Sequence, residues 1–336
     1  MEHYLDSELS ARWFGDPPRR IAVRATRVRA GLEADAVHVV TVSGRDAQGR
    51  RVERRYVRKV AHGTPAREAG VYQRLVQQHL PGFAPRLLHV GRPADGTTIL
   101  CLEHVDRVQR WPWAELEVSA AVLERLARLH EVKPAAPLPA WDYDAELAVT
   151  GAWTLDVARR VASSPARALV HGDLKAIEDV VAELGPLRRH LRRARPFAGR
   201  VLHGDLHPGN VLCRRRGGRL EVLLVDWARA RIGSALEDVS AWLQSLSIWE
   251  PEMHRRHDTL LARYLAAAGA APRLTTELRD LYWLATASNA LAGALAFHLA
   301  AVAAQPAYDP AAPSARCARG WIRALRQARA RLRSRA

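Results

Sequence analysis

The sequence contains 336 residues, of which 48% are hydrophobic and 26% are charged, a composition that fits one large globular domain or two smaller ones. It excludes a collagen-like chain, a disordered chain and a disulfide scaffold. The formal net charge is +16, but only three of the 51 basic residues are lysines, so the arginine excess resembles coding bias as much as design. The basic charge favours anionic partners and leaves nucleic-acid binding as a lesser alternative.

Two features of the sequence favour a cytoplasmic location. The N-terminal extension, residues 1–20, carries Glu2, Asp6 and Glu8 before any apolar run, which is unlike a secretory signal. The three cysteines contain no C-x-x-C pair, which argues against a zinc site and against a secreted disulfide framework. We therefore expect a protein of the reducing cytoplasm.

Short β-type runs separated by turn residues fill the chain from residue 21 to about residue 105. The predicted strands are Ile21–Val28, Val37–Val42, Arg51–Val60, Arg86–Val90 and Thr97–Glu103. The first three are expected to form an antiparallel meander. Thr64 and Pro65 are typical of a helix start, and apolar residues then recur at helical spacing to about Gln78. Residues 21–105 are thus predicted to form a small β-rich domain with one main helix.

The rest of the chain, residues 106–336, is mainly helical in pattern. The predicted helices are Ala114–Glu131, Ala145–Ala162, Leu174–Arg193, Leu236–Gln244, Arg256–Ala268, Thr275–Ala304 and Arg316–Arg333. The uncharged run Trp283–Ala304 is long enough to span a membrane, but it contains Ser288, Asn289 and His298 and is rich in alanine. A helix buried inside a helical domain is the better interpretation, and no membrane contact is expected.

One predicted β-hairpin interrupts the helices, and polar residues gather at its two ends. Its strands are expected over Asn210–Cys213 and Leu220–Val225. Asn210 and Asp226 lie eight residues on either side of Gly218, so a turn centred there would place them opposite each other. An amide oxygen and a carboxylate suit a divalent cation such as Mg²⁺. Asp205 can reach the same space without serving as a ligand, and this division of roles is what phosphoryl transfer requires.

The loop before the hairpin carries a family resemblance. The run His203-Gly204-Asp205-Leu206-His207-Pro208-Gly209-Asn210, followed by Asp226-Trp227, resembles the catalytic loop and the metal-binding aspartate of the aminoglycoside phosphotransferase and choline kinase-like family. The resemblance implies a two-lobed protein-kinase-like α+β fold, with a nucleotide-binding N-lobe over residues 21–105 and a helical C-lobe over residues 106–336 that holds the catalytic loop and the acceptor site. It also implies Asp205 and His203 as catalytic residues, with Asp205 as the base, Asn210 and Asp226 as Mg²⁺ ligands, and ATP or GTP as the donor.

Further residues of the N-lobe fit this resemblance. Val57 and Lys59 are two residues apart on a predicted strand and point to one face, which matches the arrangement in which a small apolar residue packs on the adenine and the lysine binds the α and β phosphates. Glu68, nine residues later on the predicted helix, can pair with Lys59. The segment from Glu103 to Val105 resembles the hinge whose backbone groups bind the adenine.

Other segments match the family less well or imitate it. Arg29–Asp35 holds one glycine where kinases carry G-x-G-x-x-G. Ala228 stands where relatives often carry an acid, so the sequence does not decide whether one or two metal ions bind. Asp238 resembles the aspartate that starts a helix and supports the catalytic loop. A second run, His171-Gly172-Asp173-Leu174, precedes a predicted helix, so Asp173 is read as its N-cap. His254 and His257 have metal-like spacing without further ligands, and solvated loop residues are the favoured interpretation.

The predicted function is Mg²⁺-dependent transfer of a phosphoryl group from ATP or GTP to a hydroxyl of a small molecule, an antibiotic or a metabolite. Asp238 follows Asp226 by only twelve residues, which leaves little room for a platform that binds peptides. The basic C-terminal half argues against a strongly cationic substrate. A catalytically silent kinase-like protein that binds nucleotide is the main alternative, and a nucleic-acid-binding basic protein is the lesser one.

Overall fold

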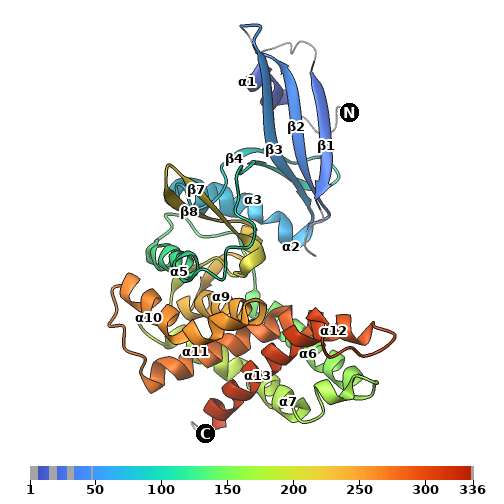
Figure 1. The fold of residues 1–336 in the computed structure, drawn as a ribbon, viewed down its shortest axis with the longest axis vertical. Helices are drawn as coiled ribbons and strands as arrows, with labels where there is room; N and C mark the ends of the chain where they lie inside the picture. Colours follow the sequence, from blue (N-terminus) through green and yellow to red (C-terminus); the bar gives the residue numbers. More distant parts are fainter. Residues whose placement is uncertain (1–6, 15–20, 29–33, 47, 334–336) are drawn as a thin grey trace. The chain divides into compact units, whose positions relative to one another are not determined.

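The computed structural model describes residues 7–14, 21–28, 34–46 and 48–333. The chain forms two compact units (Figure 1). The first comprises residues Met1–Arg110, Pro134–Pro139 and Val211–Ala230, and the second comprises Trp111–Lys133, Ala140–Asn210 and Arg231–Ala336. The first unit is built on a β-sheet and the second is mainly helical, so the predicted α+β fold with a β-rich N-lobe and a helical C-lobe is confirmed.

An antiparallel sheet of five strands forms the first unit, in the order β1-β2-β3-β5-β4. The strands are β1 (Ala22–Val28), β2 (Ala36–Arg45), β3 (Arg51–Ala61), β4 (Leu87–Gly91) and β5 (Thr98–Glu103). All five predicted strands are therefore present within a few residues of their expected bounds. Helix α1 (Ser7–Phe14), which the sequence did not predict, buries Leu9 and Phe14 against Val40, Val42 and Tyr56 of the sheet.

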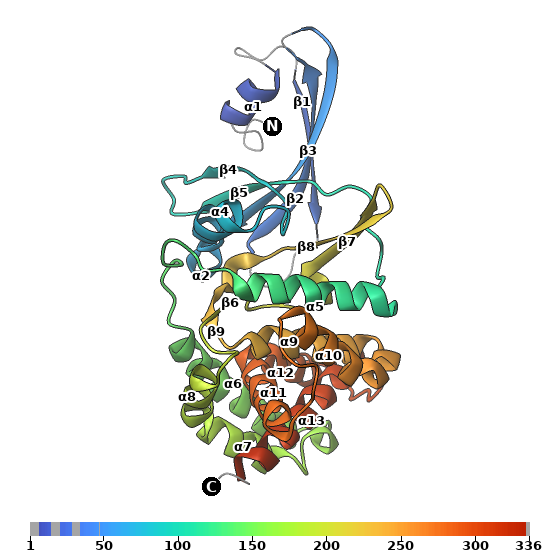
Figure 2. The same ribbon diagram turned by 90° about the vertical axis from the view of Figure 1, so that its left-hand side faces the viewer.

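The predicted helix after β3 is present as consecutive turns over residues 63–79. These are α2 (Gly63–Ala66), α3 (Glu68–Val71), a π-helical turn (Tyr72–Val76) and α4 (Gln77–His79) (Figure 2). The apolar face expected from the spacing is buried, because Val71, Tyr72 and Leu75 are fully inaccessible to solvent. Glu68 lies at the start of α3 and is also buried. This helical segment therefore brings one acidic side chain into the interior of the first unit.

The second hairpin also belongs to the first unit. Strands β7 (Val211–Arg216) and β8 (Arg219–Leu224) are joined by Gly217 and Gly218, both with positive φ, as a two-residue hairpin turn requires. Two predictions about it, the first residue of its first strand and the centre of its turn, are wrong. Asn210 does not start the strand but ends a 3₁₀ turn (Pro208–Asn210), and Val211 pairs with Leu224. The hairpin is therefore centred between the two glycines and not on Gly218.

The second unit is mainly a bundle of helices. Its α-helices are α5 (Leu116–Glu131), α6 (Tyr143–Ala162), α7 (Leu174–Ala182), α8 (Leu184–Arg193), α9 (Ala235–Trp249), α10 (His257–Ala267), α11 (Thr276–Asn289), α12 (Leu295–Ala303) and α13 (Pro313–Arg333). The single helix predicted over residues 174–193 is wrong, because the chain breaks at Glu183. Pro186 explains the break, since proline fits the first turn of a new helix and not a helix interior.

Two short strands were also missed. β6 (Arg200–Leu202) and β9 (Arg231–Gly233) form an antiparallel pair in the second unit. Three residues are too few for a strand to show a periodic pattern. The pair matters for function because β6 leads directly into the predicted catalytic loop at His203.

The apolar segment of the second unit that was predicted as one helix over Thr275–Ala304 is helical but kinked at Gly293, whose φ of 116° is non-helical. It comprises α11, a π-helical turn (Ala290–Ala294) and α12. By length and composition the stretch Thr276–Ala303 could cross a membrane, with a mean hydropathy of 1.3. Just over half of its most apolar window, 56%, is buried in the structure, and α11 packs against α9 and α13. These contacts are what a core helix makes, so the stretch is weak support for a membrane span.

Candidate active site

Lys59 is the centre of a buried charged cluster in the first unit. It lies on β3, between Val37 of β2 and Leu100 of β5, and only 8% of its side chain is exposed. Its ammonium nitrogen Nζ is 2.6 Å from Glu68 Oε2 and 2.7 Å from Asp226 Oδ1. The predicted pairing of Lys59 with Glu68 is confirmed, and the structure adds Asp226 as a second partner.

The charges in this cluster stabilise the ammonium form of Lys59. Burial alone would lower the pKa of Lys59, but the carboxylates of Glu68 and Asp226 outweigh it and raise the pKa. Glu68 is held in place because its Oε1 accepts the backbone N–H of Trp227 at 3.0 Å. Burial raises the pKa of Glu68 even beside Lys59, and at their formal charges one ammonium and two carboxylates sum to −1. A further cation is therefore electrostatically favoured beside Asp226, whose side chain is 30% exposed.

Asp226 follows β8 in a left-handed backbone conformation, with φ 67° and ψ 66°. This region is uncommon for residues other than glycine, and it is found at sites where the surrounding structure fixes it. The next residue, Trp227, is fully buried, and its Nε1 donates to Leu224 O at 3.0 Å. Trp227 thus fixes the turn that aims the Asp226 carboxylate at Lys59.

Arg67 supports the same turn and was missed in the sequence. It precedes Glu68, and its guanidinium donates to the carbonyl oxygens of Ala228, Ala230 and Pro139. Those acceptors come from separate segments of the chain. Among so many arginines, nothing in the sequence marked this one. The only available signal was its position next to Glu68.

The remaining residues predicted to bind the nucleotide lie on the same sheet or next to it. Val57 lies on β3 between Val39 and Leu102, two residues before Lys59. Glu103 ends β5, and its N–H donates to Arg86 O at 2.8 Å while its carboxylate accepts from Arg86 Nε at 3.0 Å. The amide of Glu103 is therefore already used. Val105 lies two residues beyond the end of β5.

The predicted catalytic loop lies in the second unit and is fixed by Asp238. Asp238 Oδ2 accepts the N–H of His203 at 2.7 Å, and Oδ1 accepts the N–H of Gly204 at 2.8 Å. Burial alone would raise the pKa of Asp238, but its hydrogen bond and charge interaction with His130 and the charge of His203 lower the pKa. The predicted support of the loop is confirmed. The predicted position is corrected, because Ser234, not Asp238, is the N-cap of α9.

Within the loop, Asp205 and Asn210 are in contact. Asn210 Nδ2 donates to Asp205 O at 2.8 Å and to Asp205 Oδ2 at 3.0 Å. The Asp205 side chain is 37% exposed, whereas His203 is fully buried. Both bonds use the amide nitrogen of Asn210, so its amide oxygen is the atom left to bind a cation. Oxygen donors of this kind, an amide here and the Asp226 carboxylate in the first unit, fit the chemistry of Mg²⁺.

The predicted site residues therefore form two groups, one in each unit. Lys59, Glu68 and Asp226 meet in the first unit, and Asp205 and Asn210 meet in the second. The predicted phosphate-covering loop falls mostly at residues 29–33, outside the described residues. The described residues contain no group of three or more His, Cys, Asp and Glu side chains placed to bind a metal ion.

Two of the residues that imitate catalytic or metal-binding motifs, Asp173 and His257, have structural partners. Asp173 lies at the N-cap of α7 as predicted, but its side chain makes no capping bond and instead pairs with Arg326 Nε at 2.8 Å. His257 Nε2 lies 2.7 Å from the hydroxyl of Tyr282. His254 is exposed. None of these side chains adds a ligand to the predicted site.

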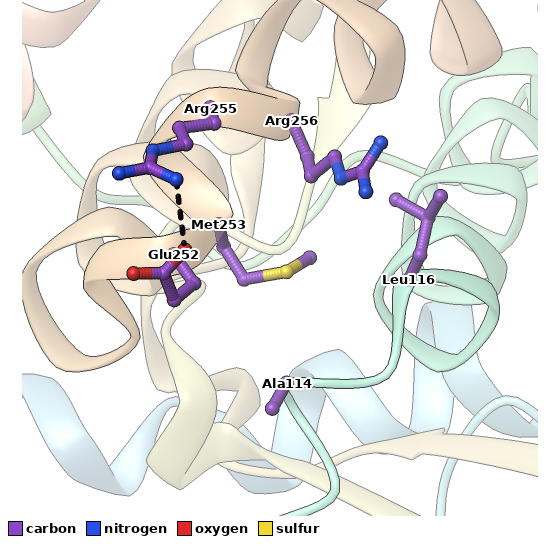
Figure 3. Close-up of a pocket in the computed structure, with 6 residues that line it drawn as sticks. All are labelled: Ala114, Leu116, Glu252, Met253, Arg255 and Arg256. Carbon is purple, nitrogen blue, oxygen red and sulfur yellow. Dashed lines mark ion pairs between the residues drawn. The ribbon is translucent and has the colours of Figure 1, made fainter.

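A separate pocket lies in the second unit between the start of α5 and the 3₁₀ turn Pro251–Arg256 (Figure 3). Its volume is about 450 Å³, and it is lined by Ala114, Leu116, Glu252, Met253, Arg255 and Arg256. The pocket follows the C-terminal end of α9, whereas Asp238 binds the catalytic loop near the N-terminal end of that helix. None of the predicted site residues lines it.

Comparison with known proteins gives a consistent result. The family model described as "Phosphotransferase enzyme family" matches residues 24–281. No curated protein matches the sequence significantly. Among solved structures, a choline/ethanolamine kinase family protein from Mesorhizobium loti is similar with a TM-score of 0.55 and 19% identity, over 93% of this chain and 92% of that one.

Two further solved structures show the same fold. An aminoglycoside phosphotransferase from Alicyclobacillus acidocaldarius matches with a TM-score of 0.55 and 16% identity, over 98% of this chain and 93% of that one. An amicoumacin kinase, solved with AMP-PNP and Ca²⁺, matches with a TM-score of 0.56 and 14% identity, over 90% of this chain and 88% of that one. At these identities the comparison concerns the fold.

Proposed function

The chain belongs to the phosphotransferase enzyme family, and from this premise we propose that it transfers the γ-phosphoryl group of ATP or GTP to a hydroxyl of a small molecule. The observation that carries the proposal is the buried lysine of β3 held by two carboxylates, Glu68 and Asp226. A charged lysine at this point binds nucleotide phosphates in kinases of this fold. The acceptor is an antibiotic or a metabolite.

On the donor side, Lys59 binds the phosphates and Glu68 keeps the ammonium in place. Val57 packs against the adenine, and the backbone near Val105 binds its edge. Glu103 contributes less than the sequence predicted, because its N–H is already bound by Arg86 O. Asn210 and Asp226 would hold Mg²⁺, which supplies positive charge to the phosphate oxygens when bound.

On the acceptor side, the Asp205 carboxylate orients the hydroxyl and takes its proton. The hydroxyl oxygen then bonds to the γ-phosphorus, and the bond from that phosphorus to the β,γ-bridging oxygen breaks, so the diphosphate nucleotide leaves with those electrons. Asn210 holds Asp205 through the bond to Oδ2. His203 is fully buried, so we assign it a positioning role, in place of the direct catalytic role predicted from the sequence.

A release assay for the diphosphate nucleotide tests the proposal. With ATP or GTP, Mg²⁺ and a panel of hydroxylated antibiotics and metabolites, the wild type should turn over, and EDTA should abolish the signal. Asp205→Asn and Asp226→Ala should each lower the rate by at least about 100-fold. Asp173→Asn is the matched control, since it changes the other His-Gly-Asp run, and it should stay within about twofold.

Equal rates in the wild type, Asp205→Asn and Asp226→Ala would refute the proposed phosphotransferase activity. They would favour the alternative of a catalytically silent protein that binds nucleotide. In that case binding of Mg²⁺–ATP would persist, and Lys59→Met would weaken it. Binding of DNA or RNA with a steep dependence on salt would instead support the nucleic-acid alternative.

A further inference from the structure

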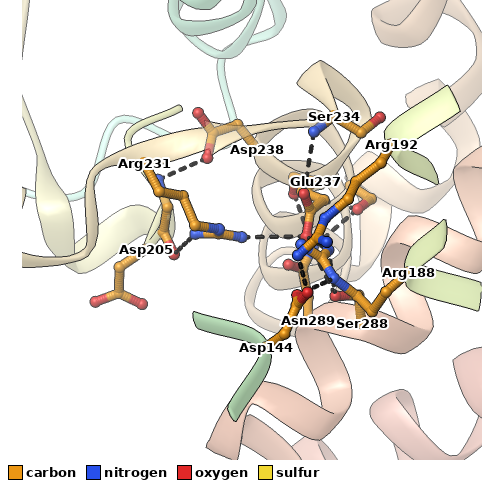
Figure 4. Close-up of polar contacts among 12 residues, drawn as sticks. Asp144, Arg188, Arg192, Asp205, Arg231, Ser234, Glu237, Asp238, Ser288 and Asn289 are labelled. Atoms are coloured by element: carbon orange, nitrogen blue, oxygen red, sulfur yellow. Dashed lines mark hydrogen bonds and ion pairs between the residues drawn. The ribbon is translucent and has the colours of Figure 1, made fainter. Parts of the chain in front are cut away.

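We propose that Arg231 is a positioning residue, which fixes the loop carrying Asp205 by binding the backbone carbonyl of Gly204. The inference deepens the proposed function and rests on it for the role of Asp205. Arg231 lies on β9, and Figure 4 shows its side chain extending between the Asp205 loop and Glu237 of α9. No motif in the sequence distinguished it from the other arginines.

Both backbone groups of Gly204 are held by buried charged side chains. Its N–H donates to Asp238 Oδ1 at 2.8 Å, and its carbonyl accepts from Arg231 Nη1 at 3.1 Å. Gly204 has φ of 84°, a conformation that glycine adopts without strain. The peptide groups on the two sides of Gly204 are thus each held, which sets the direction in which the Asp205 side chain leaves the backbone.

Arg231 is itself tightly held and is only 6% exposed. Its backbone pairs with Leu202, the residue before the loop begins at His203. Its guanidinium carbon lies 3.7 Å from the centre of the Tyr143 ring, and Nη2 donates to Glu237 Oε1 at 3.1 Å. A planar guanidinium can make these contacts together, whereas a lysine ammonium cannot span them.

Glu237, the carboxylate partner of Arg231, is fixed by three further groups. Oε2 accepts the N–H of Ser234 at 3.1 Å, and Oε1 accepts from Ser288 Oγ at 3.2 Å and from the guanidinium of Arg188. Burial alone would raise the pKa of Glu237, but Arg231 and Arg188 outweigh it and lower the pKa. Arg188 lies on α8 and Ser288 on α11, so the contact at Gly204 is anchored to the helical bundle.

The experiment compares Arg231→Lys with Arg188→Lys in the full-length protein. Both arginines are buried and both bind Glu237 Oε1, but only Arg231 binds the loop. Hydrogen exchange of the His203 and Gly204 amides should quicken about tenfold or more in Arg231→Lys and stay near wild type in Arg188→Lys. The rate of diphosphate release should show kcat about 10- to 100-fold lower in Arg231→Lys, with the nucleotide KM within about twofold. Arg231→Gln, which keeps one amide donor, is a second variant should the first fail to fold.

The outcomes separate the two proposals. A wild type without Mg²⁺-dependent turnover refutes the proposed function, while hydrogen exchange still decides whether Arg231 fixes the loop. Wild-type exchange in the folded Arg231 variant overturns the inference. The inference also fails when Arg188→Lys quickens exchange at His203 and Gly204 equally, or when the loop loosens and kcat is unchanged.

Discussion

At the scale of single residues, Lys59 is expected to contribute to folding stability as well as to nucleotide binding, because its charge is buried. Removing it would leave Glu68, with 1% of its side chain exposed, as an uncompensated buried charge beside Asp226. We expect Lys59→Met to lower the free energy of unfolding by about 3–5 kcal/mol. Adding Glu68→Gln should restore part of that loss, because the buried group is then neutral. Urea unfolding at pH 7 measures both effects.

Lys175→Met is the matched control for this comparison. Lys175 pairs with Asp179 at 3.0 Å, but 70% of its side chain is exposed. Exposed ion pairs contribute little, so the change should stay within about 0.5 kcal/mol. Equal losses in Lys59→Met and Lys175→Met would show that the Lys59 cluster is not buried as described.

Part of the pH dependence of folding stability should come from a single side chain, His298 on α12. Burial lowers the pKa of His298 to about 4, whereas the unfolded chain keeps the ordinary value of about 6.5. The unfolded state therefore binds more protons between these values, and the wild type should lose about 2–3 kcal/mol of stability as the pH falls from 6.5 to 4. His298→Gln should remove that part of the slope in urea unfolding. The control is His254→Gln, at an exposed position, which should keep the wild-type dependence of stability on pH. If His298→Gln also kept that dependence, His298 would not be its source.

At the scale of elements, the β6–β9 pair depends on the absence of a side chain at Gly233. A Cβ there would lie 2.6 Å from Leu202 Cδ1 and 2.7 Å from Glu237 Oε2. Both neighbours are buried, so neither can move aside without disturbing the strand that leads into the catalytic loop. Gly233→Ala should destabilise the protein by about 1–3 kcal/mol in thermal or urea unfolding.

Gly172→Ala is the control for Gly233→Ala. No atom would lie within 4 Å of a Cβ at Gly172, so its effect should stay within about 0.5 kcal/mol. Similar stability in the two alanine variants would mean that β6 and β9 are not packed as closely as described.

The elements also show what a sequence can and cannot predict. The strands of the first sheet and most helices were predictable because their apolar residues recur with a clear period. The loop with Asp205 and Asn210 was predictable because its residues are close together in the chain. The β6–β9 pair was too short to show a period. Arg231 and Arg67 were not predictable, because their roles depend on backbone carbonyls from distant segments.

At the scale of the whole molecule, the first unit is assembled from three separate segments of the chain. The segment Met1–Arg110 holds the five-stranded sheet, but several of its partners come later. Leu224 N–H donates to Phe83 O at 2.7 Å, and Trp227 N–H donates to Glu68 Oε1 at 3.0 Å. The sequence predicted a nucleotide-binding lobe ending at residue 105, and that boundary stays a prediction.

A fragment of residues 1–110 tests whether those later segments are required for folding. The fragment would keep Lys59 and Glu68 but lose Asp226, and Arg67 would lose its acceptors at Pro139, Ala228 and Ala230. Buried polar groups left without partners are strongly destabilising, so we expect no cooperative unfolding transition and a poorly dispersed amide spectrum. The full-length chain under the same conditions should show both a transition and dispersion. A cooperative transition in the fragment would mean that the hairpin β7–β8 serves the nucleotide site without holding its sheet together.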